Sequence, residues 1–358
     1  MSKNIGELSA FELGNAFYRK ELDPVDSLNY FLSRIKKSNN KSVFINILEN
    51  RARKEAEASA LRYSSGRALG AFDGVPVAWK DLIDVAGSST TRGSEILRNA
   101  KKSKVDSWVV ENCSSIGMVT LGKVNLTEFA FSGLGLNPHY GTPTNPFGSK
   151  EKQFVPGGSS SGSAVAVSDQ LSPIAVGTDT GGSVRIPASF NGLVGFKPSE
   201  GYLDNRGVWP LSHTLDTVGP IGKCFTDCLL MMKALKGDKL FLPDSGKVNE
   251  LTMLIPENYV FENVSQDVMK NFDNSISKLE IKGARIKKVK FDVFNKMLDI
   301  SKKHGTIATA ESYFNLKKYI DNSFQKKIDE RVLSRINMGK KQSALDYLMI
   351  AESRKKQN

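Results

Sequence analysis

The first 66 residues carry apolar side chains at the spacing of amphipathic helices. One apolar stripe surrounds a potential Ser9 cap and consists of Leu8, Phe11, Leu13 and Phe17. Asp23-Pro24 is typical of a helix start, and the stripe that follows it consists of Leu28, Phe31, Leu32 and Ile35. Residues 51–64 fit a third, charged helix. The pattern therefore predicts an N-terminal helical portion over residues 1–66.

The pattern changes over residues 67–225, where glycine and serine are dense and short apolar runs end at turn residues. These runs cover residues 75–79, 118–121, 174–176 and 193–196. Short continuous apolar runs between helical stretches are typical of buried strands in an α/β sheet that helices cover on both faces. We expect this segment to form the core of the protein.

Residues 226–358 are expected to be mainly helical. A helix is predicted over residues 264–283, where Gly283 ends it, followed by a strand over residues 286–291 and Lys-rich helices up to residue 355. No internal repeat or low-complexity tract interrupts the chain. We therefore assign residues 1–358 to a single domain.

Composition narrows the class of protein. The 358 residues are 40% apolar and 25% charged, as expected of a globular protein. A net charge of +12 would suit a nucleic-acid partner, but many of the cations fall in Lys-rich helical stretches after residue 280. Such stretches usually form solvated helix faces, so charge alone predicts no nucleic-acid binding.

Three features predict a cytoplasmic location. The cysteines are Cys113, Cys224 and Cys228, whose spacing fits neither a disulfide framework nor a zinc site. The N-terminus lacks the apolar segment of a secretory signal. No run approaches the about 18 apolar residues of a membrane span. We expect no metal, no cofactor and no membrane association.

The densest chemical signal is a pair of glycine-serine loops, residues 156–163 and 177–187. Such loops can be plain turns. A phosphate cradle would need a Lys-Ser or Lys-Thr pair after the glycines, and neither is present. A nucleophile elbow centred on Ser160 would need an acid and a histidine downstream, where only His213 and His304 are available.

A serine without histidine needs another base, and Lys80 is the candidate. It ends the apolar run 75–79, where burial would disfavour its ammonium form and lower its pKa. A neutral lysine can accept a proton from a serine hydroxyl. Taken alone, a lysine at a strand end is more often a surface residue.

Four segments in fixed order resemble the amidase signature family. They are Gly74-Val-Pro-Val-Ala-Trp-Lys-Asp81, Gly122-Lys-Val-Asn-Leu-Thr-Glu-Phe-Ala130, Gly157-Gly-Ser-Ser-Ser-Gly-Ser163 and Gly177-Thr-Asp-Thr-Gly-Gly-Ser-Val-Arg-Ile-Pro-Ala188. Residues 192–198 and 215–220 also match. The resemblance extends from about residue 5 to the end, and it implies an α/β fold with a central mixed sheet covered by helices on both faces.

The resemblance implies a Ser-cisSer-Lys site. Ser183 would be the nucleophile, Ser159 the bridging serine after a cis peptide bond, and Lys80 the base. The oxyanion hole would use the amides of Thr180, Gly181, Gly182 and Ser183, because glycines let backbone amides turn towards the substrate. The resemblance also implies supporting roles for Ser160, Asp179 and Arg185.

The implied reaction is hydrolysis of a small carboxylic amide to a carboxylate and ammonia or an amine. One alternative is the A subunit of a tRNA-dependent amidotransferase, which releases ammonia from glutamine for a partner subunit that modifies charged tRNA. Residues 210–220 look more like general amidases, so we expect a stand-alone enzyme and leave a homodimer open.

A second alternative is a truncated, inactive protein. Members of this family usually continue for roughly a hundred further residues, whereas this chain stops at Asn358. The substrate pocket cannot be assigned from the sequence, although His139, Tyr140 and Trp209 are candidates to line it.

Overall fold

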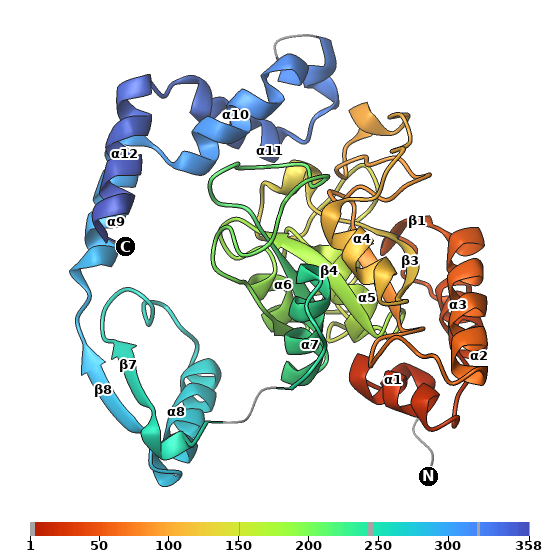
Figure 1. Cartoon of the computed structure of the whole chain (residues 1–358). Coiled ribbons are helices and arrows are strands. Elements are labelled where there is room, and N and C mark those ends of the chain that lie inside the picture. The colour runs from red at the N-terminus through yellow and green to blue at the C-terminus, as the bar shows by residue number, and fades with distance from the viewer. Residues whose placement is uncertain (1–3, 150, 243–245, 321–322, 358) are drawn as a thin grey trace. The chain divides into compact units, whose positions relative to one another are not determined.

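The computed structural model describes residues 4–149, 151–242, 246–320 and 323–357 (Figure 1). The chain forms two compact units. Unit 1 comprises Met1–Leu242 and Glu311–Lys340, and unit 2 comprises Pro243–Ala310 and Lys341–Asn358. The assignment of the whole chain to one domain stays a prediction. Within the described residues, no helix is both long and apolar enough to cross a membrane.

Unit 1 is built around a mixed sheet whose strands run in the order β1-β3-β2-β4-β6-β5. The strands are β1 (Phe44–Ile47), β2 (Pro76–Lys80), β3 (Val119–Val124), β4 (Ile174–Asp179), β5 (Val194–Gly195) and β6 (Thr217–Gly222). Strand β2 is parallel to β3 and β4, whereas β1 pairs antiparallel with β3 and β6 antiparallel with β4. The sheet is therefore mixed, as expected.

Helices cover both faces of this sheet. The helices of unit 1 are α1 (Ala10–Tyr18), α2 (Pro24–Lys37), α3 (Glu49–Ser64), α4 (Trp108–Ser115), α5 (Ser161–Ser168), α6 (Arg185–Phe190), α7 (Phe225–Lys236) and α11 (Glu330–Lys340), while α10 (Ile307–Ile320) begins in unit 2. Successive side chains of a strand point to opposite faces. Every residue of β2, β3, β4 and β6 is buried, so neither face of the central sheet is open to solvent.

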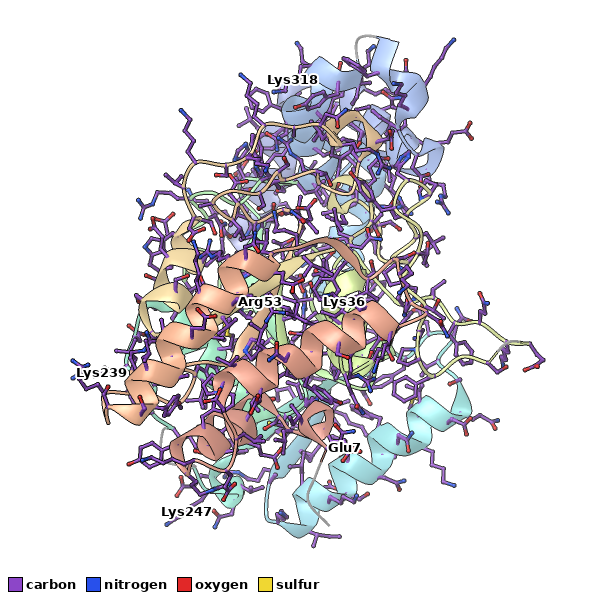
Figure 2. All side chains as sticks on the ribbon, turned by 90° about the vertical axis from the view of Figure 1, so that its right-hand side faces the viewer. Glu7, Lys36, Arg53, Lys239, Lys247 and Lys318 are labelled. Carbon is purple, nitrogen blue, oxygen red and sulfur yellow. The ribbon has the colours of Figure 1, made fainter. Side chains whose placement is uncertain are left out.

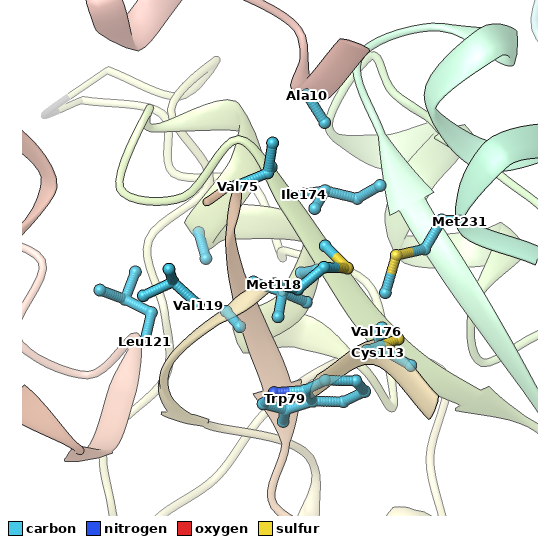
Figure 3. Close-up of a cluster of buried hydrophobic side chains, with 14 of the residues drawn as sticks. Ala10, Val75, Trp79, Cys113, Met118, Val119, Leu121, Ile174, Val176 and Met231 are labelled. Carbon is cyan, nitrogen blue, oxygen red and sulfur yellow. The ribbon is translucent and has the colours of Figure 1, made fainter. Parts of the chain in front are cut away.

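The central strands contribute to a large buried hydrophobic cluster. Trp79 and Val176 on neighbouring strands pack with Cys113 of α4 and Met231 of α7 in one buried cluster (Figure 3). Full burial of a valine or methionine side chain stabilises a fold by about 1.5–3 kcal/mol. The predicted strands 75–79, 118–121 and 174–176 are confirmed, because their apolar runs are β2, β3 and β4 of this core.

The N-terminal helices begin where the sequence predicts. Ser9 and Glu12 form a capping box at α1, and Asp23 caps α2 directly before Pro24. At the outer surface, Lys36 of α2 and Arg53 of α3, both labelled in Figure 2, reach Glu49 at 3.3 and 2.7 Å. Such exposed ion pairs contribute little to stability.

Strand β1 corrects the prediction of a wholly helical N-terminal portion. Its four residues, Phe44–Ile47, pair with β3 at the edge of the sheet. A strand this short has little periodicity of its own, and its conformation depends on a partner strand that lies far along the chain.

Unit 2 contains a two-stranded parallel sheet of β7 (Thr252–Pro256) and β8 (Arg285–Val289). Its helices are α8 (Gln266–Ile281), α9 (Asp292–His304) and α12 (Ala344–Gln357). Single-turn 3₁₀ segments elsewhere in the chain cover Ile5–Glu7, Glu95–Leu97, Glu128–Ala130, Val248–Glu250 and Ser323–Lys327. The predicted helix 264–283 and strand 286–291 are confirmed with shifted ends, whereas β7 was not predicted.

Candidate active site

Lys80 ends strand β2 with its side chain fully buried. Its Nζ lies 2.8 Å from Ser159 Oγ and 2.8 Å from Thr178 Oγ1. Burial lowers the pKa of Lys80 to about 7, although the charges of Asp216 and Asp179 act in the opposite direction. The predicted contact between a lysine of low pKa and Ser159 is therefore present.

The sheet brings these residues to one edge. Strands β2 and β4 are parallel, with Trp79 opposite Val176, so both strands end on the same side. Lys80 at the end of β2 thus lies beside Thr178 near the end of β4. Polar groups at the carboxyl ends of parallel strands are the usual site of chemistry in α/β sheets.

Ser159 lies in the loop before helix α5. The peptide bond between Gly158 and Ser159 is cis, as the resemblance implies. The carbonyl of Ser159 accepts a hydrogen bond from the Thr127 amide at 3.1 Å. Glycine at position 162 lets this segment approach β3 closely, because a Cβ there would lie 2.4 Å from the Asn125 backbone nitrogen.

Ser160 supports the neighbouring loop rather than contacting Lys80 directly. Its Oγ donates to the Thr178 carbonyl at 3.2 Å, and its amide donates to the Ser183 carbonyl at 3.2 Å. Ser160 thus joins the two glycine-serine loops. The histidines that an elbow centred on Ser160 would need have other partners: His213 contacts Asn315 at 2.7 Å and His304 contacts Asp346 at 2.8 Å.

Ser183 lies in the loop between β4 and α6, which the buried Asp179 organises. The Asp179 carboxylate accepts from the Gly182 amide at 2.7 Å and from the Val184 amide at 3.1 Å. Arg185 adds a two-pronged contact, with Nε and Nη2 3.0 and 2.9 Å from the two carboxylate oxygens.

The electrostatics of Asp179 agree with this role. Burial works to raise the pKa of its carboxyl, but the hydrogen bonds from Arg185, Val184 and Gly182 outweigh burial and lower it. An ionised Asp179 therefore holds the loop on which Ser183 sits. Ser183 itself is 8% exposed, which leaves its side chain at the boundary between the interior and solvent.

The amides after Asp179 differ in their partners. Gly182 adopts φ +124°, a conformation that favours glycine, and its amide donates to Asp179. No acceptor is described for the amides of Thr180, Gly181 and Ser183 within the residues that the structure covers. Gly181 is exposed, and an added Cβ there would meet nothing within 4 Å.

Sequence analysis assigned no role to Thr178 or to the ion pair of Asp81 and Lys123. Thr178 contacts Lys80 with its hydroxyl, and Lys123 Nζ lies 2.7 Å from Asp81 Oδ1 in a fully buried pair. All three residues lie inside the segments that resemble the amidase signature family. Their position in those segments is the signal that could have identified them. Which of these polar groups face one another depends on strand register, which the segments do not specify.

The three candidate pocket residues lie in unit 1 with specific partners. His139 Nε2 is 3.2 Å from Glu128 Oε2. The Arg92 guanidinium stacks 3.5 Å from the Trp209 ring centroid, and Trp209 Nε1 donates to Asp84 at 3.0 Å.

Tyr140 carries the Arg98 guanidinium 4.4 Å over its ring. These contacts give all three side chains packing roles, and a role in lining the substrate pocket stays a prediction.

The amidase-signature fold is characterised by a mixed β-sheet covered by helices, with a buried lysine and two serine loops at one end of its central strands. A family model described as Amidase matches residues 26–357, so the chain belongs to the amidase family. A solved structure described as an amidase superposes with a TM-score of 0.86 at 26% identity, covering 97% of this chain and 77% of that chain. Kluyveromyces lactis allophanate hydrolase superposes with a TM-score of 0.82 at 26% identity, covering 98% and 58%.

Curated relatives point to a narrower group. The A subunit of the glutamyl-tRNA(Gln) amidotransferase of Chlamydia pneumoniae is 34% identical over 324 residues, a match that covers 87% of this chain and 64% of that protein. Its counterpart from Chlamydia abortus, which has the same description, is 35% identical over 327 residues, with the same coverage of both chains. The chain thus spans slightly less than two thirds of the length of these relatives.

Proposed function

We propose that the chain hydrolyses a carboxylic amide through an acyl-enzyme on Ser183, with Ser159 and Lys80 as the proton relay. The observation that carries this proposal is the 2.8 Å contact between Lys80 Nζ and Ser159 Oγ in a fully buried setting. A lysine whose pKa is about 7 is partly neutral at neutral pH, and its free amine can accept a proton.

The relay begins as Ser183 Oγ attacks the amide carbon. The Ser183 proton moves to Ser159 Oγ while the Ser159 proton moves to Lys80 Nζ, which becomes an ammonium. Serine can pass a proton in this way because its hydroxyl both donates and accepts. The carbonyl oxygen of the substrate takes up the electron pair and becomes an oxyanion.

Collapse of this tetrahedral intermediate returns the proton. Lys80 gives a proton back through Ser159 to the leaving nitrogen, the carbon–nitrogen bond breaks, and ammonia or an amine leaves. Water then attacks the ester on Ser183 and loses its proton along the same path. The carboxylic product leaves and Ser183 regains its proton, so the site returns to its starting state.

The oxyanion would be held by the amides of Thr180, Gly181 and Ser183. The Gly182 amide already donates to Asp179, and we therefore assign it to the loop rather than to the oxyanion. Loss of one such donor typically costs about 2.7–4 kcal/mol of transition-state stabilisation.

The identity of the substrate amide is inferred from the proteins that this chain resembles. Subunits of glutamyl-tRNA(Gln) amidotransferase match 87% of this chain, which favours glutamine as the ammonia donor and a second subunit that receives the ammonia. The eleven residues 210–220, on which we expected a stand-alone amidase, carry less weight than a match of this length. A general amidase acting on a small amide remains the second candidate.

An ammonia-release assay tests both the reaction and the substrate. The chain should release ammonia from glutamine faster than from asparagine or simple aliphatic amides, and Ser183→Ala should lose this turnover while it keeps the fold. Ser189→Ala, on the exposed end of α6, is the matched control. Turnover that persists in Ser183→Ala would reject the assignment of the nucleophile, and a preference for aliphatic amides would select the second candidate.

A further inference from the structure

Asp216 is a buried carboxylate directly before strand β6. It takes no part in the proton relay of Ser183, Ser159 and Lys80. Its side chain is 7% exposed. Oδ1 accepts a short hydrogen bond from the Thr180 hydroxyl, and Oδ2 accepts from the amides of Leu211 and Ser212 at 2.8 and 3.1 Å. Every one of these contacts is donated to the carboxylate, which suits its ionised form.

The sheet places Asp216 and Lys80 on opposite sides of the same strand end. The strand order is β2-β4-β6, and the register pairs Asp179 of β4 with Thr217 of β6. Lys80 therefore flanks the end of β4 from β2, and Asp216 flanks it from β6.

Each side chain also contacts a threonine hydroxyl at this strand end. Lys80 contacts the hydroxyl of Thr178, and Asp216 contacts the hydroxyl of Thr180. Thr178 lies in β4, whereas Thr180 lies in the bend directly after the strand. The two hydroxyls thus hold the Lys80 and Asp216 side chains two residues apart at the carboxyl end of β4.

We propose, on the basis of the proposed function above, that Asp216 is a positioning residue for the reaction. Its carboxylate fixes Thr180 at the start of the oxyanion loop, and its negative charge stabilises the Lys80 ammonium that forms when Ser183 attacks. One carboxylate thereby couples the geometry of the oxyanion loop to the charge state of the base.

The charges around Lys80 support this role. Burial lowers the pKa of Lys80, and the two charges that raise it are Asp216 and Asp179. Asp179 is already engaged by Arg185, whereas the contacts described for the Asp216 carboxylate come from neutral donors. Burial raises the pKa of the Asp216 carboxyl, and its hydrogen bonds and the Lys80 charge act against burial.

Nearby ionic groups are paired with one another. On β2 and β3, Asp81 is paired with Lys123, so that pair adds little net charge at the site. The contacts described for Lys80 Nζ are all with neutral groups: the hydroxyls of Ser159 and Thr178 and the Thr178 carbonyl. Asp216 is therefore the carboxylate whose removal should change the charge balance of the base most directly.

Asp216→Asn removes the charge and keeps the shape. The amide oxygen can still accept from the Leu211 and Ser212 amides, while its nitrogen can donate to the Thr180 hydroxyl, which is able to accept. Thr180→Val does the reverse: it removes the hydroxyl contact and leaves the carboxylate charge. Asp204→Asn removes an exposed carboxylate paired with Arg206 and serves as the control.

The test combines a titration with kinetics. The Lys80 Cε resonance of ¹³C-lysine-labelled protein, assigned by its loss in Lys80→Met, is followed against pH in the wild type and each variant. In Asp216→Asn the midpoint should fall by about one pH unit, because an attractive charge that favoured the ammonium is gone. The midpoint of the acidic limb in the pH profile of kcat/KM should fall by the same amount. Asp204→Asn should leave the midpoint, the activity and the melting temperature unchanged.

Thr180→Val should lower kcat by about tenfold or more with little change in KM or in the Lys80 midpoint, and Thr180→Ser should recover most of the loss. An unchanged Lys80 midpoint in Asp216→Asn would overturn the electrostatic role, and an undiminished kcat in Thr180→Val would overturn the positioning role.

Failure of the proposed function is a separate result. In that case the wild type neither releases ammonia nor becomes phosphonylated on Ser183 by a fluorophosphonate, a reaction that forms an oxygen–phosphorus bond and expels fluoride and is read by intact mass. The titration of Lys80 would still report on Asp216.

Discussion

Lys123 Nζ lies 2.7 Å from Asp81 Oδ1, and both side chains are fully buried. Asp81 directly follows Lys80 at the end of β2, and Lys123 lies on the neighbouring strand β3. Thr91 donates its amide to the other oxygen of Asp81 at 2.9 Å, and Lys123 contacts the Thr90 hydroxyl at 3.0 Å. The pair satisfies its own charges. Lys123 thus has a buried carboxylate as its partner, whereas the contacts described for Lys80 Nζ come from Ser159 and Thr178.

Lys123→Met should destabilise the chain by about 3–5 kcal/mol, because it leaves Asp81 as an unpaired buried charge. Chemical denaturation monitored by circular dichroism measures this loss. The double variant Asp81→Asn with Lys123→Met should lose less than the single variant, since it removes both charges. Equal losses in the two variants would show that the pair is not coupled.

The rate of amide hydrolysis should rise with pH through a midpoint near 7, which is the pKa of Lys80. Below this midpoint the ammonium cannot accept a proton from Ser159, and above it the free amine can. The measurement is kcat/KM from about pH 5 to pH 9, in buffers of constant ionic strength. A flat profile with chemistry rate-limiting would contradict a lysine base.

Lys80 should also make stability depend on pH. Its pKa is lowered from 10.5 in the unfolded chain to about 7 in the folded chain. Between these values the unfolded chain binds the additional proton, so the free energy of unfolding rises with pH and falls again towards pH 7. From about pH 7.5 to 9.5, the wild type should gain about 2 kcal/mol relative to Lys80→Met. Equal slopes in the two proteins would mean that Lys80 is charged when folded.

Arg185→Gln should lower kcat by about tenfold, because the two-pronged contact that holds Asp179 and the Ser183 loop is lost. Arg185→Lys should restore only part of the rate, since an ammonium cannot reproduce the planar fork. Arg206→Gln, which removes an exposed arginine paired with Asp204, is the control. A rate unaffected by Arg185→Gln would show that the Ser183 loop keeps its shape without this contact.

Gly162→Ala should destabilise the chain although alanine favours helices. A Cβ at this position would lie 2.4 Å from the Asn125 backbone nitrogen, so α5 or the segment after β3 must move. Gly246→Ala meets no atom within 4 Å and is the control for thermal melting. We expect a lower melting temperature and slower turnover for Gly162→Ala alone.

The sequence predicted the parts of the site that lie in continuous segments. The apolar run before Lys80 predicted a buried strand end, and the segments that contain Ser159 and Ser183 matched a known family. The sequence did not specify the register in which the strands pair. Thr178 and Asp216 became neighbours of the site only through the pairing of β4 with β2 and β6, which depends on distant parts of the chain.

Two other differences have the same origin. Strand β1 is defined by its pairing with β3, and its four residues are too few to show a strand periodicity by themselves. The Gly182 amide was expected at the oxyanion hole, yet a glycine-rich segment does not specify which acceptor each amide will meet. The Asp179 carboxylate reaches that amide because the loop turns back on the end of β4.

The order of strands also has a kinetic consequence. Lys80, Ser159 and Asp216 come together only after β2 has paired with β4 and β4 with β6, and the first of these pairings joins residues about a hundred positions apart. Pairings of such long sequence separation form slowly, whereas single helices form within about a microsecond. During refolding, recovery of turnover should therefore lag behind recovery of the circular-dichroism signal of the helices. The time at which activity returns would then report when the sheet is complete.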